Sequence, residues 1–93
     1  MEISVKDDGK KGALYVETDG KILAEMHFVW AGHDKIIIDH TDVDESLKGK
    51  NVGKQLLHRG VLFARKKQIK ILPLCPFAKS VFEKNEEYQD VLF

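Results

Sequence analysis

The sequence predicts a single domain of mixed α/β (α+β) class, in which an antiparallel meander leads into a parallel strand–helix–strand crossover and then a second helix. Three observations support this fold. Four short apolar stretches separated by turn residues precede residue 41. A long segment with helical spacing of apolar residues occupies 52–67, and another apolar stretch follows at 69–72. Two strands joined by one helix form a right-handed parallel unit.

Length and composition indicate an ordinary globular protein. The 93 residues are enough for one domain, which we place at 1–93. No apolar run approaches the roughly 20 residues of a membrane span, and the first residues lack the apolar core of a secretory signal. The single cysteine, Cys75, cannot form an intramolecular disulfide, which is typical of a reducing compartment. We therefore expect a cytoplasmic protein with no membrane partner.

Charge is distributed unevenly along a chain whose net charge is zero. Residues 1–46 contain eleven acidic residues and five lysines, whereas residues 47–82 contain nine basic residues and no acidic one. A block of one sign indicates an anionic partner. Nucleic acid is the least favoured partner, because few aromatic residues lie in the block to stack on bases and no nucleic-acid-binding helix motif is present.

Alternating polar and apolar residues predict the strands of the meander. In the third strand, one face carries Ile22, Ala24, Met26 and Phe28. In the fourth, the continuous run from Ile36 to Ile38 predicts burial on both faces and a central position in the sheet. The predicted strands are 2–6, 13–17, 22–29, 35–40 and 69–72.

The segment 52–67 is predicted to be the central helix, with its apolar residues on one arc. This arc comprises Gly53, Leu56, Leu57, Gly60, Val61, Phe63 and Ala64. A glycine in a helix interior costs about 1 kcal/mol relative to alanine. We therefore expect Gly53 and Gly60 to bring the helix close to the sheet.

A second helix is expected from Pro76, a residue suited to the first helical position. We predict that the helix extends to about residue 85 and that residues 86–93 dock on the core, with a last strand as one form of that docking. The predicted inward face of the helix consists of Phe77, Ala78, Val81 and Phe82.

The segment from Lys48 to Lys54, Lys-Gly-Lys-Asn-Val-Gly-Lys, directly precedes and opens the central helix. A glycine-containing loop at this position offers unpaired backbone N–H groups and the positive end of the helix dipole. That arrangement binds anions, phosphates in particular. The alternative is a basic helix start on a solvated surface, because short glycine motifs also occur by chance.

This order of elements resembles the core of the GNAT superfamily of acyl-CoA-dependent N-acetyltransferases. The family's pyrophosphate loop reads Arg/Gln-x-x-Gly-x-Gly/Ala, and residues 48–53 lie in that register. Lys48 replaces Arg or Gln, and Asn51 replaces the first glycine. Asparagine tolerates a left-handed backbone, so the turn can be retained, and its side chain can also cap the helix.

The resemblance is closer to the short, single-domain GNAT-like proteins. It rests on Ile38-Asp39-His40-Thr41, on Leu74-Cys75-Pro76-Phe77-Ala78 and on Tyr88-Gln89-Asp90-Val91. In that branch the two helices that usually cover the acceptor site are missing, and here too no helix is predicted between residues 5 and 36.

The resemblance implies that acetyl-CoA is the cosubstrate and that its acetyl group passes to an amine the sequence does not identify. A non-catalytic acetyl-CoA-binding module or sensor is the alternative, favoured by the missing acceptor wall. A nucleic-acid-binding basic patch ranks third. A homo-oligomer is left open, since a second copy could complete the exposed site.

The cofactor-binding residues follow from the loop and the resemblance. The amides of Asn51 to Lys54 are expected to hold the pyrophosphate, with lysines acting as point charges. The resemblance also implies that the pantetheine arm runs beside the end of the fourth strand. The predicted set is Thr41, Val43, Lys48, Gly49, Lys50, Asn51, Val52, Gly53 and Lys54.

Cys75 and His40 are the candidate catalytic residues. A cysteine at a helix start has its thiolate favoured, so Cys75 could accept the acetyl group or protonate the leaving CoA thiolate; a buried structural thiol is the alternative. His40 ends the fourth strand, where an imidazole could accept a proton from the amine; Asp39 is a weaker base or an orienting group. The remaining histidines show no metal-ligand spacing with Cys75, so we predict no metal site.

Overall fold

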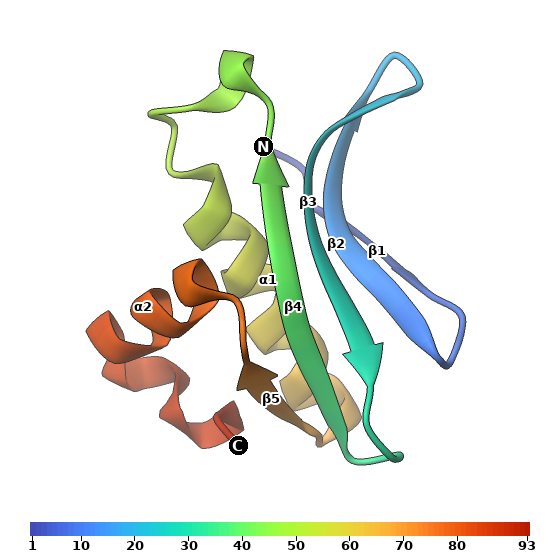
Figure 1. Ribbon diagram of the computed structural model, residues 1–93, viewed down its shortest axis with the longest axis vertical. Coiled ribbons are helices and arrows are strands. Elements are labelled where there is room, and N and C mark those ends of the chain that lie inside the picture. The colour runs from blue at the N-terminus through green and yellow to red at the C-terminus, as the bar shows by residue number, and fades with distance from the viewer.

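The computed structural model describes residues 1–93 and contains one five-stranded mixed sheet in the order β1-β2-β3-β4-β5. The first three neighbouring pairs are antiparallel, and β4 and β5 are parallel, as predicted for the meander and crossover. Figure 1 shows the first three strands as a curved layer beside β4. The strands are β1 (Ser4–Asp7), β2 (Lys11–Thr18), β3 (Lys21–Trp30), β4 (Lys35–Val43) and β5 (Lys70–Pro73).

Two α-helices and two 3₁₀ helices complete the domain. The central helix α1 (Val52–Lys67) has the bounds predicted from its apolar periodicity, and α2 (Pro76–Lys84) begins at its proline. The 3₁₀ helix η1 (Glu45–Leu47) follows β4, and η2 (Glu86–Val91) follows α2. Neither α-helix combines the length and apolar character that crossing a membrane requires.

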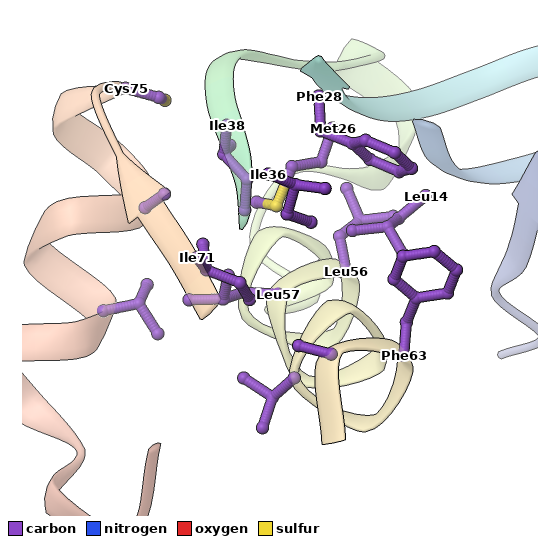
Figure 2. Close-up of a cluster of buried hydrophobic side chains, with 14 of the residues drawn as sticks. Leu14, Met26, Phe28, Ile36, Ile38, Leu56, Leu57, Phe63, Ile71 and Cys75 are labelled. Carbon is purple, nitrogen blue, oxygen red and sulfur yellow. The ribbon is translucent and has the colours of Figure 1, made fainter. Parts of the chain in front are cut away.

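The hydrophobic core lies between the sheet and α1. Figure 2 shows Leu14, Met26 and Phe28 of the sheet converging with Leu56 and Phe63 of the helix. Ala24, Met26 and Phe28 of β3 are buried in this core, as the period-two pattern predicts. Ile22, which we expected on the same face, is 41% exposed, because the register between β2 and β3 shifts between its pair and that of Ala24. Helix α2 lies beside β5 and packs against β4, β5 and α1 (Figure 1).

The two helix glycines have packing reasons, but only one concerns the sheet. A Cβ on Gly60 would lie 2.8 Å from Leu14 Cδ1, so this glycine permits close approach of α1 to β2, as predicted. A Cβ on Gly53 would lie 2.4 Å from Phe77 Cζ. Gly53 therefore makes room for the start of α2, not for the sheet.

Three other expectations need correction. Ile37 is only partly buried, because the face of β4 that it occupies is not covered by α1. Phe77 does not face inward, since 42% of it is exposed. Residues 86–93 dock on the core, but as η2 followed by a single parallel bridge between Ile71 and Leu92.

A β-bulge interrupts the pairing of β3 with β4. Phe28 pairs with Ile38 and His27 with His40, so Asp39 is the extra residue. A bulge of this kind bends the strand and places two neighbouring side chains opposite one partner. Asp39 and His40 consequently share the face of the sheet that α1 does not cover, and with Glu25 and His27 of β3 they define what we call the open face.

Candidate functional site

A cleft of about 580 Å³ lies between the end of β4, the loop 48–54 and the start of α2. Eight of the nine predicted cofactor-binding residues line it; the exception is Lys50, whose carbonyl instead accepts a 3.2 Å hydrogen bond from Gln55 Nε2. The lining residues are Thr41, Asp42, Val43, Leu47, Lys48, Gly49, Asn51, Val52, Gly53, Lys54 and Phe77.

The loop that opens α1 contains two residues with left-handed backbone. Gly49 has φ of +81°, and Asn51 has φ of +60° and ψ of +30°. Asparagine is among the non-glycine residues that most readily adopt this conformation, so the turn forms without a glycine at position 51. The Asn51 side chain makes no capping hydrogen bond, contrary to the capping role we had allowed it.

Four consecutive backbone N–H groups at the start of α1 have no acceptor within the protein. They belong to Asn51, Val52, Gly53 and Lys54, and the first helical bond is donated by Gln55 to Asn51 O at 3.2 Å. All four residues line the cleft. Converging N–H groups at the positive end of a helix dipole form a site for an anion.

Charged side chains around these amides are mostly basic. Lys54 forms no ion pair, whereas Lys48 Nζ lies 3.2 Å from Glu45 Oε2 in an exposed pair. The first turn of α1 contains no acidic residue. Asp42 is the one carboxylate among the lining residues. A phosphate group would therefore meet little opposing charge at the helix start.

The strands β4 and β5 part at the cleft. Their ladder ends at Ile38 and Pro73, while β4 continues to Val43. The backbone N–H groups of Leu74 and Cys75 both donate to Ile38 O at 3.0 Å, which closes the narrow end of the opening.

Cys75 lies at the N-cap of α2, where the sequence predicted it, and is 6% exposed. Its Sγ lies 3.5 Å from Thr41 Oγ1, a hydrogen-bonding contact in which either atom can donate. Cys75 does not itself line the cleft, but Thr41 does. The thiol is therefore joined to the cleft through one hydroxyl group.

His40 lies on the other side of β4 from Thr41. Neighbouring residues of a strand point to opposite faces, and His40 belongs to the open face, with 53% of its side chain exposed. The structure thus separates the two predicted catalytic side chains, with Cys75 on the cleft side of β4 and His40 on the open side.

The sequence analysis missed that His27 joins Asp39 and His40. His27 Nδ1 lies 2.7 Å from Asp39 Oδ1, and the two imidazole rings stack with centroids 4.8 Å apart. His40 Nδ1 lies 3.6 Å from the same oxygen. Desolvation raises the pKa of Asp39, but the hydrogen bond and charge of His27 outweigh it, so this pKa lies below its ordinary value.

Comparison with known proteins shows the family. A family model described as GCN5-related N-acetyl-transferase matches residues 13–91, and the chain belongs to this family. The comparison with curated protein sequences gave no significant match.

Solved structures support the same assignment. The solution structure of a GCN5-like protein from Staphylococcus aureus, assigned provisionally as an N-acetyltransferase, is 37% identical with a TM-score of 0.72. The match covers 97% of this chain and 87% of that one.

Two more distant structures share the fold alone. The ribosomal-protein-alanine N-acetyltransferase of Brucella melitensis biovar Abortus 2308 is 21% identical with a TM-score of 0.67, and nourseothricin acetyltransferase is 20% identical with a TM-score of 0.52. The matches cover 83% and 72% of this chain, but only 62% and 41% of those two chains, respectively.

Proposed function

We propose that this protein binds acetyl-CoA in the cleft and transfers the acetyl group to an amine that arrives from the open face. The observation that carries the proposal is the row of four unpaired N–H groups from Asn51 to Lys54, placed where β4 and β5 part. Membership of the GCN5-related family supports acyl transfer as the reaction class.

The pyrophosphate is held by the loop amides, and Lys48 and Lys54 add positive charge at the same place. The pantetheine arm then follows β4 past Val43 and Thr41, toward the narrow end that Ile38 closes. The uncovered backbone of β4 polarises the thioester carbonyl. The acetyl group thereby reaches the level of His40 and Cys75.

The chemistry is a direct attack of the amine nitrogen on the thioester carbonyl carbon. A C–N bond forms, the C–S bond breaks, and the sulfur leaves as the CoA thiolate. His40 accepts the proton released by the amine, because its imidazole is on the open side of β4. The Cys75 thiol passes a proton to Thr41, whose hydroxyl donates its own to the CoA thiolate, since the two groups are 3.5 Å apart. Solvent then reprotonates Cys75.

An amide NMR titration with acetyl-CoA tests the binding step. We expect the largest shifts at the amides of residues 49–54 and at Thr41, and none at the β1–β2 turn. Unchanged amides at saturating acetyl-CoA would refute the proposed site.

Release of free thiol from acetyl-CoA in the presence of an amine panel tests the chemical step. We expect turnover to fall at least about 100-fold in His40→Ala, as for loss of a general base. Cys75→Ala should lower kcat without weakening acetyl-CoA binding. Normal turnover in both variants would show these roles to be wrong. Binding without turnover for any amine would instead favour a non-catalytic acetyl-CoA-binding module, the alternative that the uncovered face of the sheet supports.

A further inference from the structure

We propose that His27, Asp39 and His40 form a binding site for a divalent transition-metal cation such as Zn²⁺. One ligand atom from each side chain can be chosen so that all three lie within 4.8 Å of one another. Asp39 Oδ1 faces both imidazoles, 2.7 Å from His27 Nδ1 and 3.6 Å from His40 Nδ1. Around a tetrahedral zinc ion with bonds of about 2.0–2.1 Å, neighbouring ligand atoms lie about 3.3 Å apart. The two distances from Asp39 Oδ1, 2.7 Å and 3.6 Å, are therefore close to the separation that zinc ligands require.

The donor set determines which cation is favoured. Two imidazole nitrogens with one carboxylate suit Zn²⁺, Ni²⁺ or Cu²⁺, whereas Mg²⁺ prefers oxygen ligands. Three protein ligands leave a fourth tetrahedral position open for water. The side chains are 23%, 39% and 53% exposed in the order His27, Asp39, His40, so an ion can enter from solvent.

The scaffold holds the donors in place before any ion binds. His27 and His40 are direct cross-strand partners, and the bulge brings Asp39 onto the same face. The next cross-strand pair on the same face of the sheet is Glu25 with Asp42, which adds two carboxylates close to the cluster. Lys6, 3.3 Å from Glu25, is the one lysine paired with this group. The local charge therefore favours a cation.

The cluster departs from our sequence-based expectation of no metal site, which considered only spacing relative to Cys75. His27 and Asp39 are twelve residues apart, a separation that suggests no local motif, and only the strand pairing and bulge join them.

Metal binding and the proposed proton transfer compete for one side chain. An imidazole nitrogen that binds a cation cannot accept a proton, so an ion at this site would suppress acetyl transfer through His40. This consequence rests on the proposed function, whereas metal binding can be measured without acetyl-CoA. A failure of metal binding is thus distinguishable from a failure of the proposed acetyl transfer.

The experiment is a calorimetric titration of the full chain, free of any polyhistidine tag, with ZnCl₂, together with NMR of the histidine rings. We expect one ion per chain, with ring shifts at His27 and His40 and none at His33. His27→Gln, Asp39→Asn and His40→Gln should each weaken binding by at least about tenfold, the lower bound for losing even a group that supports a ligand. His33→Gln is the matched control and should bind Zn²⁺ as the wild type does, and MgCl₂ should give no saturable heat.

Several results would overturn the proposal. These are the lack of saturable Zn²⁺ binding up to millimolar concentration, unchanged affinity in His27→Gln or His40→Gln, or loss of binding in His33→Gln. Co²⁺ absorption provides a further check, because a thiolate charge-transfer band that disappears in Cys75→Ser would place the ion at Cys75 instead. If a variant fails to fold, the Zn²⁺-induced shifts of the His27 and His40 rings in the wild type still test whether the ion binds at this cluster.

Discussion

Lys50 and Lys54 belong to the same loop, but only Lys54 lines the cleft, and this difference makes a sharp test of how the loop binds acetyl-CoA. Lys50→Gln and Lys54→Gln each remove one positive charge and keep a side chain of similar reach. If the pyrophosphate lies on the amides of residues 51–54, only the Lys54 variant should lose a direct partner.

The magnitude follows from Coulomb's law. Two unit charges 4 Å apart interact by about 1 kcal/mol in water and about 4 kcal/mol at an effective dielectric of 20. Lys54 is partly exposed, so the lower value applies and we expect about a fivefold rise in Kd. Lys50→Gln should change Kd by less than about twofold, since Lys50 does not line the cleft and its charge is screened over roughly 10 Å at 0.1 M salt.

Calorimetry with acetyl-CoA at about 0.1 M and 1 M salt measures both effects. The difference in acetyl-CoA Kd between the two variants should narrow at 1 M salt, where the screening length is about 3 Å. An equal or larger loss in Lys50→Gln would show that the ligand does not lie on the amides of α1, and the reasoning would fail.

Three further predictions concern stability and turnover. Gly60→Ala gains about 1 kcal/mol of helix propensity but overpacks Leu14 at a cost of about 1–3 kcal/mol, so urea unfolding should show net destabilisation of about 1 kcal/mol, and a more stable variant would contradict the close packing. The bidentate hydrogen bonds from Arg65 to Asp90, at 2.9 Å each, lower the pKa of Asp90 below its ordinary 3.8. Wild type should therefore exceed Asp90→Asn in stability above about pH 4, and this advantage should be lost as pH falls through the lowered pKa; a difference that persists at the lowest pH would exclude this origin. Thr41→Val should lower kcat in the thiol-release assay and leave the Kd of acetyl-CoA within about fivefold, because it removes only a hydroxyl of about 1 kcal/mol; unchanged kcat would exclude the relay.

Local patterns predicted most of the fold. The bounds of α1 followed from the 3.6-residue period of its apolar residues. Leu62, an apolar residue outside the predicted arc, is exposed in the structure. The contribution of loop 48–54 to the cleft was equally predictable, because the proposed phosphate site depends on backbone N–H groups and not on the identity of distant side chains. Seven consecutive residues thus indicated most of the cleft.

Features that depend on tertiary packing were less predictable. We expected Gly53 to contact the sheet, because helical periodicity predicts which arc of a helix is buried but not which element covers that arc. In the structure, Phe77 of α2 covers Gly53. The same limit explains why Phe77 was placed in the core, although it lines the cleft.

The open-face cluster was missed for a different reason. A regular strand would alternate Asp39 and His40 between faces, and only the bulge brings both beside His27. The sequence signal that could have indicated it is weak: a polar pair, Asp39-His40, follows directly after an apolar run. Nothing in the one-dimensional pattern fixes the register with β3.

The bulge also sets the phase of the remainder of β4. With strict alternation from Ile38, His40 would face the core and Thr41 would face solvent; the extra residue exchanges them, and Thr41 pairs with buried Met26. A deletion of Asp39 alone would therefore give a regular ladder that keeps His40 opposite His27 and Thr41 opposite Met26, whereas a regular strand that retained Asp39 would bury the imidazole and withdraw the hydroxyl from Cys75. The bulge absorbs one amino acid without shifting the register that follows, and it thereby decides which face of the sheet each reactive group occupies.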